Sequence, residues 1–253
     1  MIELVRRNKI AVATLCRPPV NAINREWMVR FREILDELER DTGIGVLHIR
    51  SAIRVFCAGF DIGLIRQHLE TGGGPAAQID DTRRLQDIYF RLERLPQVTI
   101  AEINGAAMGG GLELALSCDL RIAAEEAVMG LPEANLGQVP GAGGTQRLTR
   151  LCGAGTASRL ILACESVNGR KAEQLGIVQW AIPAGQLERE AAALSERVAG
   201  LPSETLAASK TCIAAQSERG RTGYDMELQM NLRLLGTKET QACVAAFFNR
   251  AKR

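Results

Sequence analysis

Apolar residues recur at two different spacings along this chain, and each spacing predicts a different secondary structure. Between residues 27 and 38 the apolar positions lie three or four residues apart, which is typical of one face of a helix. Asn24 precedes this pattern as the predicted N-cap, and Gly43 follows its end. A second face of the same kind spans residues 85–95 and is stopped by Pro96. We predict that both helices turn these faces toward a core.

Short apolar runs bounded by turn residues predict strands over residues 10–15, 46–49 and 98–103. Helical and strand patterns alternate through most of the chain, and a further helix is expected after Gly144. Such alternation indicates an α/β architecture with a largely parallel sheet. The glycine-rich stretch 71–77 is predicted to be a mobile loop, because glycine leaves the backbone flexible.

The C-terminal part of the chain differs from the rest, because only helical patterns follow Gly185. They predict helices over residues 187–198, 203–216 and 237–251. We therefore expect a core over residues 1–185 and a helical C-terminal region over residues 186–253. The last predicted helix has an apolar face formed by Val244, Phe247 and Phe248. This region has too few residues to bury that face alone.

The charge balance argues against polyanionic partners. The chain has 31 Lys and Arg residues against 29 Asp and Glu residues, so its formal net charge is only +2. Neither nucleic acid nor a membrane surface is therefore expected as a partner. No apolar run approaches the roughly 18 residues of a membrane span, and Arg6 and Arg7 lie where a signal peptide would be apolar. We expect a soluble, cytoplasmic protein.

Cysteine and histidine usage argues against disulfides and bound metal. The seven cysteines are odd in number and include no C-x-x-C pair, which is typical of a reduced, intracellular protein. Cys118 and Cys164 have apolar neighbours in sequence and are expected to be buried structural thiols. His48 and His68 are the only histidines, so we predict no metal site, and we expect His48 to pack at a sheet surface.

The stretch 104–147 concentrates the features that indicate chemistry. Its three consecutive glycines, residues 109–111, let a ligand approach the backbone closely, because glycine has no side chain to obstruct it. The good helix formers that follow predict a helix start. Unpaired N–H groups of a first helical turn attract negative charge.

Two carboxyl groups accompany these glycines. Glu113 lies one turn into the predicted helix, and Glu133 follows 20 residues later, after the breakers Gly130 and Pro132. If the chain doubles back there, both acids lie beside the helix start. That arrangement suits proton transfer next to a developing oxyanion. The alternative is a glycine turn with two solvated glutamates.

Four motifs carry a family likeness: GGGLE at residues 109–113, LPE at 131–133, PGAGGTQRL at 140–148 and FCAGFDI at 56–62. Together they resemble the signature of the enoyl-CoA hydratase/isomerase (crotonase) superfamily, and the resemblance extends from about Ile10 to the C-terminus. It implies an α/β spiral of repeated ββα units. It also implies that an all-helical C-terminal region builds homotrimers or homohexamers.

The resemblance further implies reversible hydration of a 2-enoyl-CoA thioester, with coenzyme A as part of the substrate and no separate cofactor. The backbone N–H groups of Phe60 and Gly110 would stabilise the enolate oxygen. Glu113 would activate the water that attacks C3, and Glu133 would handle the proton at C2.

The same likeness indicates which residues contact the acyl-CoA. They are Ala58, Asp61 and Ile62 of the AG-x-D loop, Pro19 and Val20 of the turn before NAI, and Gly109 and Gly141. Many family members carry a basic residue just after the D-[LI] pair, where this chain has Gly63. Arg66 or Arg25 is the candidate to meet the phosphates instead.

Other functions stay open at this point. Double-bond isomerisation and a specialised hydroxyacyl-CoA dehydration use the same enolate. Family isomerases commonly keep only the second acid, so the presence of both Glu113 and Glu133 favours hydration. An inactive scaffold or an RNA-binding member is a different class. The intact acids and the lack of basic runs with interleaved aromatics disfavour it.

Overall fold

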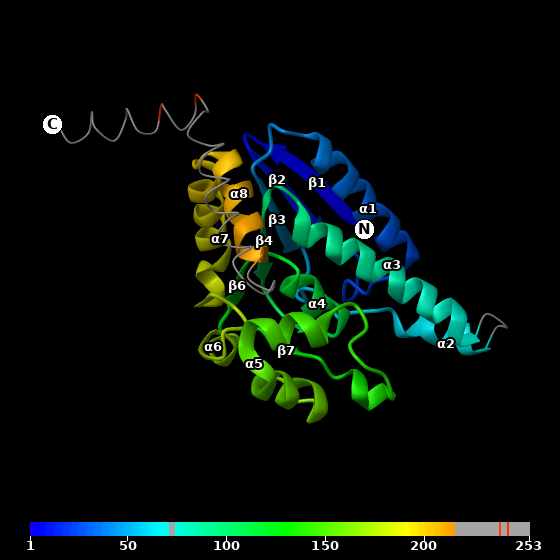
Figure 1. The fold of residues 1–253 in the computed structure, drawn as a ribbon. Helices are drawn as coiled ribbons and strands as arrows, with labels where there is room; N and C mark the ends of the chain where they lie inside the picture. Colours follow the sequence, from blue (N-terminus) through cyan, green and yellow to red (C-terminus); the bar gives the residue numbers. More distant parts are fainter. Residues whose placement is uncertain (71–73, 216–237, 239–241, 243–253) are drawn as a thin grey trace.

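A six-stranded sheet forms the centre of the computed structural model, which describes residues 1–70, 74–215, 238 and 242 (Figure 1). Its order is β1-β2-β3-β4-β6-β8. These strands span Ile2–Arg7 (β1), Ile10–Leu15 (β2), Val46–Ser51 (β3), Val98–Ile103 (β4), Leu120–Ala124 (β6) and Trp180–Ile182 (β8). The β1–β2 pair is antiparallel and the other neighbouring pairs are parallel. The predicted α/β architecture with a largely parallel sheet is confirmed.

The edge strand β1 is one of the strands that the apolar pattern does not predict, and the opposite edge strand β8 is another. Most residues of β1 are exposed, and it includes Arg6 and Arg7. A charged edge strand protects a sheet from further pairing, but it carries little apolar periodicity. The strands that lie deeper in the sheet do carry an apolar signal, and all six residues of β4 are buried.

Helix α1 (Arg25–Arg40) begins where the sequence places it. The side chain of Asn24 accepts a hydrogen bond of 2.9 Å from the N–H of Trp27, which caps the helix. The predicted apolar face is buried and consists of Trp27, Met28, Phe31, Ile34, Leu35 and Leu38. The rings of Trp27 and Phe31 stack with centroids 4.8 Å apart. Both the helix and its core face are therefore confirmed.

Helices α2 (Ile62–Glu70) and α3 (Gly74–Arg94) pack against each other, and α3 also packs along α1 (Figure 1). The sequence pattern does not predict α2. The prediction of a mobile loop is wrong for residues 74–77, because these residues form the first turn of α3. Pro75 is tolerated there because the first turn of a helix does not need its N–H. Residues 71–73 lie outside the described part of the chain.

A second, two-stranded sheet positions the glycine-rich stretch. Strand β5 (Ala107–Met108) pairs in parallel with β7 (Met129–Gly130). The short helix α4 (Gly110–Leu116) follows β5, and the 3₁₀ helix η1 (Glu133–Leu136) follows β7. All residues of α4 are buried. Because β5 and β7 run side by side, the segments that leave them start next to each other.

Four further helices follow along the described chain. They are α5 (Gly144–Leu162), α6 (Gly169–Gln174), α7 (Ala184–Ala199) and α8 (Ser203–Ala214). The helix expected after Gly144 is confirmed, although Gly153 interrupts it with a φ of 78° and a ψ of 161°. The first two predicted C-terminal helices are present as α7 and α8. The third, with Val244, Phe247 and Phe248, lies outside the described residues.

Helix α7 packs on one face of the main sheet, and His48 lies in that contact. Its Nε2 is 2.9 Å from Oε2 of Glu102, and its Nδ1 is 3.2 Å from Oγ of Ser195. All three side chains are buried. This position agrees with the packing role expected for His48.

Six cysteines of the described chain have free thiols. Cys118 is buried as expected, whereas Cys164 is only half-buried. No described helix is long and apolar enough to cross a membrane. Within the described ranges, His, Cys, Asp and Glu side chains form no group of three that could hold a metal ion.

Candidate active site

A cavity of about 580 Å³ opens between the loop before α2, helix α3, the start of α4 and the segment that contains η1. Glu113 and Glu133 both line it, and so do Phe60 and Gly110. Residues separated by as many as 73 positions, from 60 to 133, therefore meet around one space. The structure brings together the four residues that sequence analysis singled out for chemistry.

Helix α4 and the start of α5 hold the carboxyl of Glu113. Its Oε1 accepts hydrogen bonds of 2.8 Å from the N–H of Ala142 and 2.7 Å from the N–H of Gly144. Burial raises the pKa of Glu113 from 4.5 to about 7, and the nearby charge of Glu133 adds to this rise. The two amide bonds and Arg147 oppose it. A carboxyl with such a pKa can both accept and release a proton near neutral pH.

Glu133 is the first residue of η1, directly after Pro132. Its Oε2 is buried and has no hydrogen-bond partner among the described residues. Burial raises the pKa of this carboxyl too. Leaving a buried polar atom unpaired costs free energy, so such an atom beside a cavity is typical of a site that a ligand completes.

Gly109 makes room for Glu133. A Cβ on residue 109 would lie only 2.9 Å from Oε1 of Glu133, and the φ of 51° is one that other residues rarely adopt. The first glycine of the triplet is therefore required both for backbone conformation and for close approach of the carboxyl.

Two backbone N–H groups lie beside the acids. Ile23 N–H donates to the carbonyl of Gly59, and Asp61 N–H donates to the carbonyl of Ile23, so these bonds lie on either side of Phe60. The N–H of Phe60 itself has no acceptor in the described chain. Gly110 N–H, at the start of α4, likewise has no acceptor there. A Cβ on Gly59 would lie 3.0 Å from Gly110 N, so the two segments are in close contact. Neighbouring free N–H groups can stabilise a negatively charged oxygen.

Some residues that shape this site are not singled out by sequence reasoning. The hydroxyl of Tyr89 contacts the carbonyl of Gly110, and Nη1 of Arg147 donates a 2.8 Å bond to the carbonyl of Ala142. Arg147 is buried and also pairs with Glu93 at 3.1 Å. The available signal for Arg147 is a charged residue inside the otherwise small and neutral PGAGGTQR motif.

The residues expected to contact acyl-CoA divide into two groups. Those that line the cavity are Ala58, Ile62, Gly109 and Gly141. Pro19, Val20 and Asp61 do not line it. Val20 lies next to the loop, because its carbonyl accepts a 3.0 Å bond from the N–H of Ala58. The carboxylate of Asp61 pairs with Arg17 at 3.0 Å.

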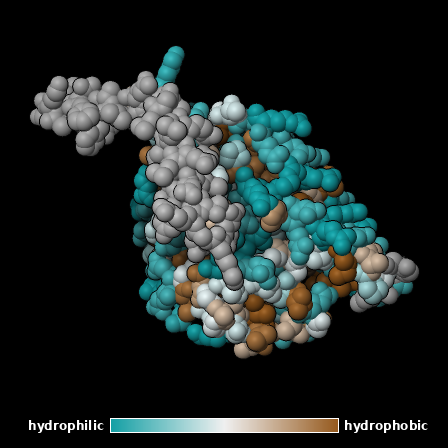
Figure 2. Space-filling model, viewed as in Figure 1, coloured by the Kyte–Doolittle hydropathy of each residue, from teal (hydrophilic) through white to brown (hydrophobic). Residues whose placement is uncertain are grey.

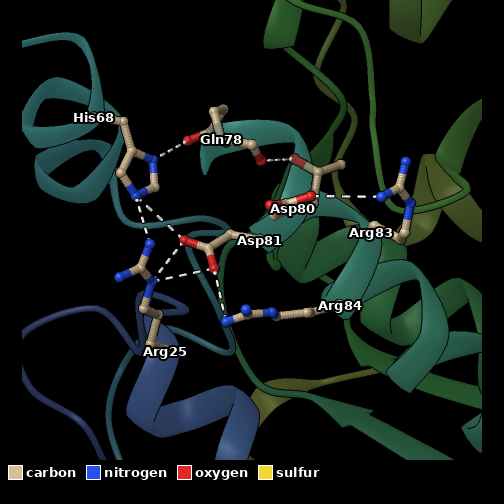
Figure 3. A network of polar contacts seen from close by, with 8 residues as sticks. Arg25, His68, Gln78, Asp80, Asp81, Arg83 and Arg84 are labelled. Carbon is tan, nitrogen blue, oxygen red and sulfur yellow. Dashed lines mark hydrogen bonds and ion pairs between the residues drawn. The ribbon is translucent and has the colours of Figure 1, made fainter. Parts of the chain in front are cut away.

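The two arginines considered for the phosphates are placed differently. Figure 3 shows that Arg25 points to Asp81, with Nε 2.8 Å from Oδ2, and also contacts His68. Its guanidinium is therefore held by a buried acid. Arg66 is 77% exposed and 3.8 Å from Glu70, so its guanidinium stays accessible to solvent.

Comparison with known proteins agrees with this geometry. Residues 5–253 match the family described as enoyl-CoA hydratase/isomerase. The chain is 39% identical over 207 residues to a probable enoyl-CoA hydratase of Bacillus subtilis (strain 168), covering 81% of this chain and 79% of that protein. It is 34% identical over 254 aligned positions to 2,3-dehydroadipyl-CoA hydratase of Escherichia coli (strain K12), covering 99% and 97%.

The fold agrees as well. The crystal structure of an enoyl-CoA hydratase from Bacillus anthracis matches with a TM-score of 0.92 at 30% identity, over 98% of this chain and 96% of that one. The predicted crotonase fold is thereby confirmed. Motifs, fold and sequence identity lead to one conclusion: the chain belongs to the enoyl-CoA hydratase/isomerase family.

Proposed function

We propose that this protein catalyses the reversible hydration of a 2-enoyl-CoA thioester to a 3-hydroxyacyl-CoA. One observation carries the proposal: the buried carboxyl of Glu113 and the half-buried one of Glu133 line a single cavity, beside N–H groups of Phe60 and Gly110 that have no acceptor among the described residues. Hydration needs this combination, because a proton must be removed from water and another delivered to carbon while charge develops on the thioester oxygen.

The N–H groups of Phe60 and Gly110 bind the thioester oxygen in this proposal. As water adds to C3, electrons move from the double bond to that oxygen and form an enolate. Each well-placed donor contributes about 2.7–4 kcal/mol of transition-state stabilisation, so two donors contribute about 5–8 kcal/mol. This is the largest single contribution that we assign to the site.

The two glutamates carry the protons. Glu113, ionised, accepts a proton from the water whose oxygen attacks C3. Glu133, protonated, delivers its proton to C2 of the enolate, so that H and OH have added across the double bond. The raised pKa values of both carboxyls support this sharing of one proton. General acid–base help of ~10²–10⁴-fold corresponds to roughly 3–5 kcal/mol more.

We assign the CoA portion to the rim of the same cavity. Ala58, Ile62, Gly109 and Gly141 line it and are the first candidates for contact. The turn with Val20 supports the loop from behind through the bond to Ala58. Assembly into a homotrimer or homohexamer through residues 186–253 is part of the same proposal.

The second candidate is isomerisation of the double bond, which the family name includes. It needs only one acid to move a proton between C2 and C4, and Glu133 with its unpaired Oε2 would suffice. Isomerisation would leave the buried, hydrogen-bonded carboxyl of Glu113 without a catalytic role. Hydration is preferred for this reason.

Product analysis separates the two candidates. The protein is incubated with trans-2-enoyl-CoAs of increasing length while the absorbance of the conjugated thioester is followed, and the products are resolved by chromatography. Loss of the absorbance with formation of 3-hydroxyacyl-CoA is expected. Formation of 3-enoyl-CoA without uptake of water would support the isomerase instead.

A further inference from the structure

Apolar side chains with unusually exposed surfaces gather around the cavity. Ile62, Ile79, Leu136 and Val139 all line it, and they are 60%, 56%, 54% and 73% exposed. Large aliphatic side chains are more often buried, and a group of exposed ones marks a binding surface. Figure 2 shows hydrophobic surface in the part of the molecule where Figure 1 places α2.

Helix α3 and the segment after η1 provide two of these apolar walls. A Cβ on Gly141 would lie 2.8 Å from Cγ2 of Thr82, so this segment lies against α3. Ile79 is one turn before Thr82 on the same helix face, and Val139 is two residues before Gly141. The two aliphatic side chains therefore belong to neighbouring walls of the cavity.

The polar side chains of the lining, apart from the two acids, are neutral. They are Gln78, Thr82 and Gln138. Thr82 Oγ1 donates a 2.9 Å bond to the carbonyl of Gln78, and Oε1 of Gln78 is 3.0 Å from Nδ1 of His68. Of the residues that the structure describes, no Lys, Arg or His lines the cavity.

Three basic side chains near helix α3 contact a buried aspartate and do not line the cavity. Arg25, His68 and Arg84 converge on Asp81, as Figure 3 shows, at 2.8, 3.3 and 3.5 Å. Asp81 is 1% exposed. Asp81 holds these three groups together, and none of them lines the cavity.

We propose that the walls formed by Ile79 and Val139 hold the acyl chain, and that they select an uncharged aliphatic 2-enoyl chain and reject a chain that ends in a carboxylate. Ile79 and Val139 are then specificity-determining residues. The proposal rests on the function proposed above. Among these aliphatic side chains a terminal carboxylate would lose hydration, and no cation of the described lining would replace it. Each additional buried methylene, in contrast, favours binding about fourfold.

The proposed substrate differs from the substrate in the name of one relative. The name 2,3-dehydroadipyl-CoA hydratase specifies a six-carbon acyl group with a second carboxyl. At 34% identity over nearly the whole chain, sequence similarity alone would suggest the same substrate. The lining of the cavity argues for a different one.

A matched pair of substrates tests it: trans-2-hexenoyl-CoA and 2,3-dehydroadipyl-CoA, which have six acyl carbons each and differ only in the terminal group. We expect kcat/KM to be at least ~100-fold higher for hexenoyl-CoA, because an unpaired carboxylate is costly to desolvate. Equal kcat/KM for the two would overturn the proposal.

Binding of the saturated analogues keeps the two proposals distinguishable. Hexanoyl-CoA and adipoyl-CoA cannot be hydrated, and calorimetry is expected to show at least ~10-fold tighter binding of hexanoyl-CoA. If this preference is found without any turnover, the proposed hydration fails and the selectivity stands. Equal affinity of both analogues overturns the selectivity, whether or not hydration occurs.

Substitutions test whether Ile79 and Val139 produce this selectivity. Ile79→Lys and, separately, Val139→Lys each add a cation to the lining, and each is expected to raise kcat/KM for dehydroadipyl-CoA at least ~10-fold relative to hexenoyl-CoA. Val139 is 73% exposed, so its variant retains the fold even if the change at Ile79 does not. Leu162→Lys, 78% exposed at the end of α5, is the control with an unchanged ratio. An unchanged ratio in both test variants would overturn the assignment.

Discussion

The hydroxyl of Tyr89 donates a 2.8 Å hydrogen bond to the carbonyl of Gly110, the residue whose N–H lies beside the cavity. Tyr89 is completely buried in the core face of α3. The buried Tyr89 thus fixes the carbonyl of Gly110, whereas the N–H of Gly110 has no acceptor in the described chain. Packing of α3 is thereby connected to the position of a proposed oxyanion donor.

Removal of that hydroxyl should affect stability and catalysis together. Tyr89→Phe removes one hydrogen bond from the buried Gly110 carbonyl, which is expected to lower the free energy of unfolding by about 0.5–1.5 kcal/mol. We also expect kcat to fall while KM changes little, because the donor serves the transition state more than the ground state. Urea unfolding and steady-state kinetics measure both. Unchanged values would mean that the bond does not position Gly110.

Gly109→Ala tests the space reserved for Glu133. The new Cβ would come within 2.9 Å of Oε1 and would adopt a φ of 51°, so loss of activity and of about 1–3 kcal/mol of stability is expected. Gly176→Ala is the matched control, since its φ is 76° but nothing lies within 4 Å of the new Cβ. The control should lose some stability and keep its activity. Equal activity of both variants would contradict the steric argument.

The two acids are tested by Glu113→Gln and Glu133→Gln, which keep the side-chain shape. Each should bind acyl-CoA and fold normally but hydrate ~10²–10⁴-fold more slowly. The double variant should lose less than the product of the two single losses, because the groups act as a unit. Glu188→Gln, 77% exposed at a surface ion pair, is the control with normal turnover. If Glu113→Gln is fully active and Glu133→Gln is dead, the isomerase becomes the better assignment.

The raised pKa of Glu113 predicts a pH effect on stability. Its pKa rises from 4.5 to about 7 on folding, so the folded state binds this proton more tightly. Stability is therefore expected to fall as pH increases from 4.5 to 7 and then to level off, a loss of about 3 kcal/mol from this group. Glu113→Gln removes the titration, so the variant should gain about that much relative to the parent between pH 5 and pH 8. Parallel pH profiles in chemical denaturation would refute this.

The proposed assembly is tested by deletion of residues 237–253. The apolar face with Val244, Phe247 and Phe248 is expected to be covered by its own or a neighbouring subunit. Truncation should therefore lower the mass of the oligomer measured by light scattering, or leave insoluble protein. A soluble truncation of unchanged oligomeric state would remove this segment from the assembly.

Local sequence patterns were sufficient for several elements. Helix α1 is determined by an apolar face and an N-cap that lie within one stretch of chain, and both are present as predicted. Strands β2, β3 and β4 follow from apolar runs of their own. The motifs around Glu113 and Glu133 also predicted a family, which the comparisons confirm. In each case the information is local, because neighbouring residues produce the pattern.

Only the tertiary structure decided the rest. The charged strand β1 is stable because it pairs with β2, and the first turn of α3 forms from residues whose composition predicts a loop. The pKa of Glu113 depends on burial and on N–H groups 29 and 31 residues away. The apolar walls near Ile79 and Val139 come from segments that meet only in the folded chain. Contacts between distant segments leave no periodic signal, so the sequence determined which groups are available, and packing decided which of them meet.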